Sequence, residues 1–241
     1  MGSLLQYVTS KLMEQSLDCF EKLSSTNQTN DLLYSIEEIF DEAIMKTVPN
    51  EKGVAFMVQD KFSVFSIDPT KSNVRGMKFF TKGGNNKLQE GNIYYDYITS
   101  NETVESFQAN IDIDLDIATY FPDDLLYYTN PNNDPSFRIV FKIYNNDILF
   151  QPASITNPNQ NVEDKVISIS IPGFDSNFQE KYLPILFKVR GNHPGCYYWN
   201  YNSWVNAGIE SSTNVSSFMF CKVNHLTPFT RITDVTKDVD K

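Results

Sequence analysis

One short segment near the C-terminus, His225-Leu226-Thr227, carries residue types that could do covalent chemistry. A threonine hydroxyl follows a peptide bond directly, and an imidazole stands two residues before it. Threonine becomes a nucleophile when a base removes its proton, and histidine is the side chain best matched to that task near neutral pH. Alone the triplet is weak support, because a given tripeptide occurs by chance in about 3% of chains this long. Its surroundings decide its meaning.

Patterns that could bind a metal or a cofactor have simpler explanations. Asp112, Asp114 and Asp116 have the spacing of a calcium loop, but an EF-hand needs glycine at the place of Ile117 and prefers glutamate at the place of Asp123. Alternation along a strand explains these aspartates better. The sequence also contains no P-loop and no dinucleotide-binding fingerprint. We therefore expect no metal and no cofactor.

The residues before the triplet form a specific frame. It consists of a cysteine and tryptophan separated by two residues, a second tryptophan, a glycine, a second cysteine and an N-H-L-T-x-F run. These elements are Cys196, Trp199, Trp204, Gly208, Cys221 and residues 224–229. The combination resembles the GPS motif (GPCR proteolysis site), the last part of the GAIN domain of adhesion receptors and polycystin-like proteins. Residues 196–232 carry the resemblance.

The resemblance implies a self-cleavage reaction between Leu226 and Thr227. His225 would deprotonate the Thr227 hydroxyl, which would attack the Leu226 carbonyl carbon in an N-to-O acyl shift. Water would then hydrolyse the resulting ester. Because nucleophile and carbonyl share one chain, placement would supply most of the acceleration. Such cis-autoproteolysis happens once per molecule, so the chain would not be a turnover enzyme.

The cysteine pattern of the family implies a Cys196–Cys221 disulfide. Its GPS motifs usually carry four cysteines in two pairs, and here Ile209 and Val223 replace both members of one pair. Two unrelated buried thiols are the alternative. With a disulfide and two histidines, no zinc-ligand set remains. The two-cysteine pattern resembles polycystin-like proteins more than most adhesion receptors, and we expect Cys19 to be a buried thiol in a helix.

The residues after the expected cut resemble the family's tethered-agonist strand. Phe229 matches that pattern and Ile232 is a reasonable substitute for leucine, whereas Thr233 departs from the usual methionine. Burial of Phe229 and Ile232 would contribute about 3–6 kcal/mol, so the strand should stay bound after cleavage. Pro228 has no N–H for a strand ladder, which fits a strand start or a turn.

Two other classes of function remain open. One is a GAIN fold that never cuts and acts as an adhesion module, a binding module or a mechanical spacer. The other is a β-sandwich of a different adhesion or carbohydrate-binding type, in which His225, Leu226 and Thr227 occur together by chance. The first alternative has physical support, because a misplacement near 1 Å can cost about a hundredfold in rate.

Composition fits a globular ectodomain. The 241 residues are 41% hydrophobic and 14% aromatic, which argues against general disorder. The net charge of −10 argues against nucleic-acid binding. No apolar run approaches the roughly 20 residues that cross a bilayer. The resemblance implies a soluble piece of a larger membrane protein on the extracellular face of the plasma membrane. Its expected partners are its own C-terminal strand, the adjoining membrane region and unknown extracellular ligands.

Three glycosylation sequons are compatible with secretion: Asn27-Gln28-Thr29, Asn101-Glu102-Thr103 and Asn214-Val215-Ser216. Three in a chain of this length is near the number expected by chance. We therefore treat Asn27, Asn101 and Asn214 as possible glycosylation sites that do not by themselves establish the compartment.

Two helices are expected in residues 1–49. Apolar residues recur at roughly helical spacing in residues 5–20 and again in residues 32–44, with a polar, turn-like stretch in residues 23–29. Asn30 and Asp31 are N-cap candidates for the second helix.

After Pro49 the hydrophobic period changes to two. In residues 111–117, isoleucine and leucine alternate with aspartate, and in residues 167–171 isoleucine alternates with serine. Both patterns predict strands with one buried and one solvated face. Further strands are expected at 54–58, 62–67, 77–80, 93–98, 137–144, 182–189, 196–201 and 218–223. The predicted class is α+β, mainly β: a helical part at 1–49 and a GAIN-type antiparallel β-sandwich at 50–241.

Overall fold

The structure is a computed structural model. It describes residues 2–15, 17–24, 28–59, 61–84, 87–102, 112–151, 160–162, 165–174, 178, 180–189, 195–215 and 218–234. All structural statements below concern these residues.

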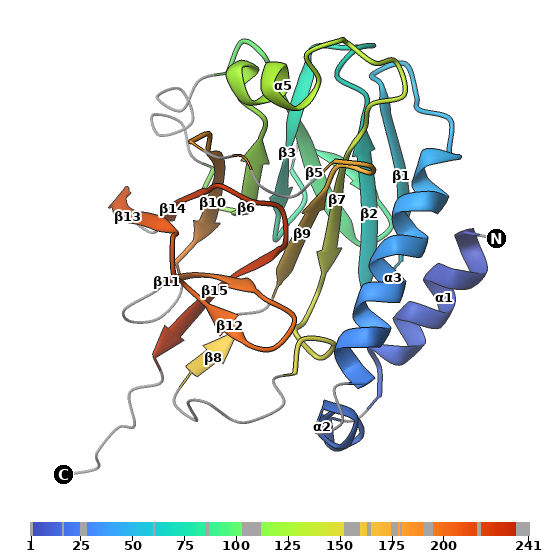
Figure 1. Ribbon diagram of the computed structural model, residues 1–241, viewed down its shortest axis with the longest axis vertical. Helices are drawn as coiled ribbons and strands as arrows, with labels where there is room; N and C mark the ends of the chain where they lie inside the picture. Colours follow the sequence, from blue (N-terminus) through green and yellow to red (C-terminus); the bar gives the residue numbers. More distant parts are fainter. Residues whose placement is uncertain are drawn as a thin grey trace.

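Two antiparallel sheets form the body of the molecule (Figure 1). The larger sheet has the order β1-β2-β7-β9-β15-β11-β12, and β8 also pairs with β15. Its strands are β1 (Val54–Val58), β2 (Phe62–Ile67), β7 (Ile139–Tyr144), β8 (Gln160–Val162), β9 (Val166–Ser170), β11 (Gly195–Trp199), β12 (Trp204–Val205) and β15 (Pro228–Asp234).

The second sheet has the order β13-β14-β10-β6-β3-β5-β4. Its strands are β3 (Val74–Phe80), β4 (Leu88–Glu90), β5 (Ile93–Thr99), β6 (Leu115–Tyr120), β10 (Leu183–Lys188), β13 (Glu210–Val215) and β14 (Phe218–Val223). The helices are α1 (Gly2–Leu12), α2 (Leu17–Ser24), α3 (Gln28–Met45) and the short α5 (Asp123–Thr129). The predicted α+β, mainly β class is confirmed.

The larger sheet is buried on both faces at β2 and β7. Its inner face packs against the second sheet through residues such as Phe65, Phe141 and Ile167. Its outer face packs against the N-terminal helices, with the Phe40 ring of α3 centred 4.4 Å from the Phe62 ring of β2. Figure 1 shows α1 and α3 running beside β1 and β2. Because helices cover this sheet, every residue of β2 and β7 is buried, as strands enclosed on both faces require.

The helical part differs from the prediction in two respects. Its described residues hold three helices rather than two, because the stretch predicted as one helix over residues 5–20 is divided by a turn at residues 13–15 into α1 and α2. Since α3 begins at Gln28, Asn30 and Asp31 lie within its first turn and not at its N-cap. Asn30 is buried there, where its amide can reach the sheet. The division between residues 1–49 and 50–241 stays a prediction.

The prediction of a strand at residues 111–117 is partly wrong. The observed strand β6 begins at Leu115, Ile113 is 78% exposed, and Asp116 is 1% exposed, the reverse of the predicted pattern. The pairing with β3 shifts between Phe79 and Phe80, so that Asp116 is the extra residue of a bulge. A bulge re-aims a side chain, and this one turns a carboxylate inward.

The serine face of β9 is not the solvated face that was predicted. The alternation itself is correct, with Ile167 and Ile169 in the core between the sheets. However, Ser168 is buried because α3 lies over this part of the sheet, and its hydroxyl donates to the Glu37 carboxylate on α3.

Candidate functional site

The His225-Leu226-Thr227 segment lies where the chain crosses from one sheet to the other. β14 ends at Val223 in the second sheet, and β15 begins at Pro228 in the larger sheet. The carbonyl oxygen of Asn224 accepts a hydrogen bond from the Phe178 N–H at 2.8 Å, which holds the start of the crossing. Pro228 pairs opposite Ser168 of β9, and this fixes the other end. The expected scissile bond is therefore held between two anchored strands.

His225 occupies a largely apolar position between two rings. Its centroid lies 4.3 Å from that of Tyr198 on β11 and 5.5 Å from that of Phe229 on β15. Its Nδ1 atom lies 3.0 Å from Oδ1 of Asn224, whereas Nε2 is buried with no hydrogen-bond partner among the described residues. Burial lowers the pKa of His225 below its ordinary value of 6.5, so the ring is neutral at pH 7.

Thr227 lies on the same turn but is not hydrogen-bonded to the imidazole. Its Oγ1 donates to the carbonyl oxygen of Pro228 at a long 3.4 Å. The structure thus brings His225 and Thr227 onto one turn but shows no hydrogen bond between the imidazole and the Thr227 hydroxyl. Catalytic hydrogen bonds are often long or absent before the reacting geometry forms, so this arrangement does not exclude the pair.

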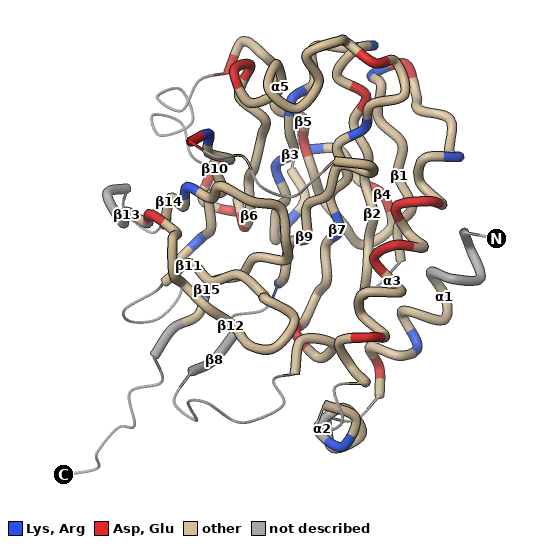
Figure 2. The backbone as a smooth tube through the Cα atoms, in the orientation of Figure 1, with Lys and Arg blue, Asp and Glu red and all other residues tan. Residues whose placement is uncertain are grey.

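The expected scissile bond borders a cavity of about 530 Å³. Leu226 is 7% exposed and packs into the core between the sheets, yet Leu226 and Thr227 both contribute to the cavity wall. The cavity is also lined by Glu37, Glu38, Asp41 and Glu42 of α3, and Figure 2 shows that acidic residues recur along this helix. The cavity gives this otherwise buried peptide bond a place where water can approach.

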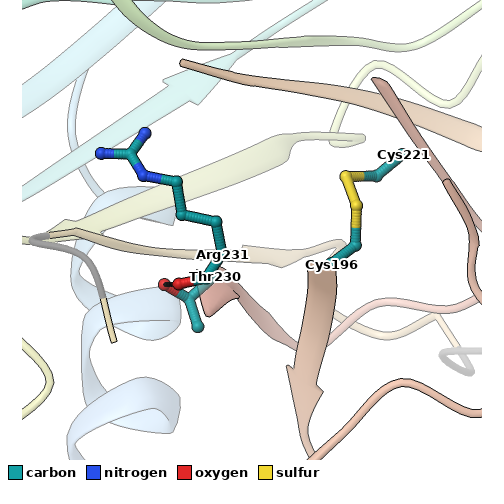
Figure 3. The surroundings of a disulfide bond; sticks show 4 residues. All are labelled: Cys196, Cys221, Thr230 and Arg231. Carbon is teal, nitrogen blue, oxygen red and sulfur yellow. Dashed lines mark hydrogen bonds between the residues drawn. A yellow bond between two sulfur atoms is a disulfide. The ribbon is translucent and has the colours of Figure 1, made fainter. Parts of the chain in front are cut away.

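The structure joins Cys196 and Cys221 in the disulfide that the family resemblance implies (Figure 3). Cys196 lies on β11 of the larger sheet and Cys221 on β14 of the second sheet, with their Cα atoms 6.2 Å apart. The bond therefore ties the two sheets together next to the crossing. Cys19 lies in a helix, α2, as expected, but the prediction of a buried thiol was wrong: this thiol is exposed, whereas its neighbour Phe20 is buried in the core.

The two tryptophans and the glycine of the motif have structural roles. Trp199 is fully buried, and its indole Nε1–H donates to Oδ1 of Asn30 at 3.1 Å. Trp204 packs against Trp199 and Phe150 with centroid separations of 5.2 and 5.5 Å. Gly208 has φ of +79°, a left-handed conformation that favours glycine. The contact with Asn30 ties β11 to α3.

A buried ionic network missed by the sequence reasoning ties β9 to α3. The Lys142 ammonium on β7 lies 2.8 Å from Glu37, 2.7 Å from Asp41 and 2.9 Å from the Ser170 hydroxyl. The Ser168 hydroxyl donates to Glu37 at 2.7 Å. Burial opposes the charge of Lys142, but the two carboxylates outweigh it and raise the pKa of this lysine. Two features of the sequence could have indicated this network. Lys142 lies inside an apolar strand, and Glu37 and Asp41 lie one helical turn apart.

A second buried ion pair holds β15 itself. The Arg231 guanidinium lies 3.4 Å from Asp116 on β6, and Lys165 lies 2.9 Å from the same carboxylate. Arg231 and Asp116 are each 1% exposed. Figure 3 shows Arg231 and Thr230 leaving β15 on opposite sides. The strand after the expected cut therefore carries a buried charge that pairs with a carboxylate of the second sheet.

The remaining sequence-derived sites are placed as follows. Asn101 is exposed, whereas Asn27 and the side chain of Asn214 lie outside what the structure describes. The Lys87 ammonium lies 3.0 Å from the Asp112 carboxylate and 3.6 Å from that of Asp114. Within the described residues, no three His, Cys, Asp or Glu side chains are grouped as a metal site would need. None of the described helices is both long and apolar enough to span a membrane.

Comparisons with known proteins identify the family. The chain matches the sequence model of the GPS motif and GAIN subdomain B over residues 71–237. Among solved structures it resembles the full extracellular region of zebrafish Gpr126/Adgrg6, with 17% identity and a TM-score of 0.57 over 90% of this chain. That likeness shows the fold, and the match spans 27% of the zebrafish chain. A search of curated proteins found no match. The chain thus belongs to the family of GAIN domains that carry a GPS motif.

Proposed function

We propose that this chain is an extracellular GAIN domain of a membrane receptor and that it cuts its own Leu226–Thr227 bond. The observation that carries the proposal is a neutral, half-buried imidazole whose buried Nε2 has no hydrogen-bond partner among the described residues, two residues from a threonine on the same sheet-to-sheet crossing. A base that is neutral at pH 7 and has no competing partner is what activation of a hydroxyl needs.

The reaction begins with a movement of the Thr227 side chain. Its hydroxyl leaves the Pro228 carbonyl and donates to Nε2 of His225. The oxygen then attacks the Leu226 carbonyl carbon as its proton passes to Nε2, and the tetrahedral intermediate forms. Collapse breaks the C–N bond, the imidazolium returns the proton to the Thr227 nitrogen, and an ester links Leu226 to Oγ1. Water entering from the cavity beside Leu226 hydrolyses this ester.

The fragment after the cut remains in place because β15 is an interior strand. It pairs with β9, β8 and β11, and the Phe229 and Ile232 side chains are 1% and 3% exposed. Burial of these two side chains alone contributes about 3–6 kcal/mol. Hydrogen bonds to three strands and the buried Arg231 add to retention. The retained strand and the adjoining membrane region are the proposed partners of the domain.

The extracellular placement of the domain rests on its disulfide and on its likeness to an extracellular receptor region. The parent protein is either an adhesion receptor or a polycystin-like protein, and the two-cysteine motif favours the latter. Release of β15 as a tethered agonist belongs to the adhesion-receptor alternative.

A GAIN fold that does not cut is the second candidate. The observation that favours it is the absence of a hydrogen bond between Thr227 and Nε2 of His225. In that case the domain would act as an adhesion or binding module, or as a mechanical spacer.

Denaturing intact mass of the purified chain distinguishes the two candidates. Cleavage gives two species, residues 1–226 and residues 227–241, that separate only after denaturation. Thr227→Ala and His225→Ala should remain one species, whereas Thr227→Ser keeps a hydroxyl and should still be cut. A wild-type chain that stays intact through prolonged incubation at pH 7–8 would overturn the cleavage proposal and leave the non-cutting GAIN domain.

A further inference from the structure

Asn224 contacts the nitrogen of His225 that does not act as the base. Its Oδ1 lies 3.0 Å from Nδ1 of the adjacent imidazole. A carboxamide oxygen only accepts hydrogen bonds, so this contact requires the proton of the neutral ring to sit on Nδ1. The lone pair is then on Nε2, the buried nitrogen without a partner among the described residues. The tautomer that leaves Nε2 able to accept a proton is the one that Asn224 stabilises.

The other contacts of His225 fix the plane of the ring but not its proton. Tyr198 meets the imidazole edge-on with an interplanar angle of 77°, and Phe229 is tilted against it at 51°. Burial is the cause that lowers the pKa of His225, and no charged group of the described residues contributes to that shift. Among the described residues Asn224 is the hydrogen-bonding partner of the ring, and we infer that this polar contact decides which nitrogen carries the proton.

Asn224 is itself held in place from another part of the chain. Its backbone carbonyl accepts the N–H of Phe178 at 2.8 Å. Phe178 is fully buried in the core between the sheets, next to Phe121 and Phe174. The side chain that orients the imidazole therefore starts from a backbone anchored in the core, so the contact does not depend on a free loop.

We propose that Asn224 is a positioning residue for self-cleavage, holding His225 in the Nδ1–H tautomer so that Nε2 accepts the Thr227 proton. This inference rests on the proposed function. When Nε2 takes the hydroxyl proton, both ring nitrogens carry hydrogen and the Asn224 oxygen continues to accept from Nδ1. The same contact therefore serves the neutral base and the imidazolium, and Asn224 neither gains nor loses a proton during the reaction.

The tautomer is tested directly by long-range ¹H–¹⁵N NMR of the imidazole in the full chain. Thr227→Ala keeps the protein intact, and a His193→Gln change leaves His225 as the one imidazole to observe. We expect the Nδ1–H pattern at pH 7.5, and its loss when Asn224→Ala is added. An Nε2–H pattern with Asn224 present would overturn the assignment. This measurement does not need cleavage, so it decides the role of Asn224 even where the wild type fails to cut.

The effect on the reaction is tested by the cleavage rate of otherwise wild-type chains. Asn224→Ala should slow cleavage roughly tenfold to hundredfold, as expected when a reacting group loses its orientation. Asn206→Ala is the matched control, because that asparagine is exposed within the same motif, and it should cut at the wild-type rate. Equal rates for Asn224→Ala and wild type across pH 5–8 would overturn the proposal.

An aspartate at this position separates positioning from simple structural support. In Asn224→Asp a carboxylate accepts from Nδ1–H, which restores orientation but favours the imidazolium and raises the pKa of His225. Cleavage should therefore recover at high pH, with the midpoint of its pH–rate profile moved upward from that of the wild type. A structural role alone would change the amount of folded protein and leave that midpoint where it was, and such a result would contradict the proposal.

Discussion

Replacement of Lys142 by methionine should destabilise the domain strongly. The lysine side chain is fully buried, and its ammonium lies within 2.8 Å of carboxylates from both Glu37 and Asp41. Methionine has a similar volume but no charge, so it would leave two acids facing each other on α3 with one cation removed. Breaking a buried ion pair by removing one partner costs about 3–5 kcal/mol, because an uncompensated charge stays buried.

The magnitude translates into a measurable melting shift. For a chain of this size, 1 kcal/mol corresponds to about 2–4 °C, so we expect the melting temperature to fall by roughly 6–20 °C. Burial also raises the pKa of Asp41, with Lys142 opposing the shift. Without the lysine that carboxyl should take up a proton more readily. Part of the loss should therefore be recovered at acidic pH, where a protonated Asp41 no longer repels Glu37.

The assay is chemical and thermal unfolding in an uncut background, Thr227→Ala, so that both states are a single chain. Lys46→Met is the matched control, since Lys46 pairs with Glu42 at 3.9 Å on the surface and should change stability by less than about 0.5 kcal/mol. Adding Glu37→Gln and Asp41→Asn to Lys142→Met should restore part of the loss. A stability of Lys142→Met within about 1 kcal/mol of its parent would refute the reasoning.

Three more outcomes are expected in the same uncut background. The disulfide closes a loop of 25 residues. Its removal through Cys196→Ala and Cys221→Ala should lower the free energy of unfolding in urea by about 3 kcal/mol. Arg231→Met should cost about 2–5 kcal/mol, because its buried carboxylate partner loses a cation; an unchanged midpoint would count against this. The pKa of His225 is lowered in the folded protein. As the pH drops below 6.5, the unfolded chain therefore binds more protons than the folded one, and the stability decreases as the pH decreases. His225→Gln should remove that part of the acid dependence, and identical pH profiles would contradict it.

The local patterns of the sequence predicted much of the fold. β1, β2 and β14 have the predicted bounds, β5 is one residue longer at its C-terminal end, and β10 is one residue shorter at each end. Each of these strands buries several apolar residues, and those residues mark the strand in the sequence without help from distant contacts. The short strands β4, β8 and β12 and the polar edge strand β13 were not predicted, since strands of two or three residues and strands of polar residues carry little hydrophobic pattern.

The sequence also identified the family of the motif, because the order of a few residues defines that motif. These residues are Cys196, Trp199, Trp204, Gly208, Cys221 and residues 224–229. The family match confirms that identification. Whether His225 and Thr227 cut the chain stays a prediction. The order of residues could not show that the imidazole is neutral, nor that its Nε2 is buried without a hydrogen-bond partner among the described residues, because both depend on what packs around the ring.

By itself, then, the sequence determined the β-rich class, the GPS frame and the residues that could react, since each is written in neighbouring positions. Only the tertiary structure decided which polar groups are buried. Lys142 meets Glu37 across 105 residues of chain, and Trp199 meets Asn30 across 169. The inward turn of Asp116 depends on a one-residue shift against β3. A buried charge becomes stable only when a distant partner neutralises it, and no local pattern records where that partner will lie.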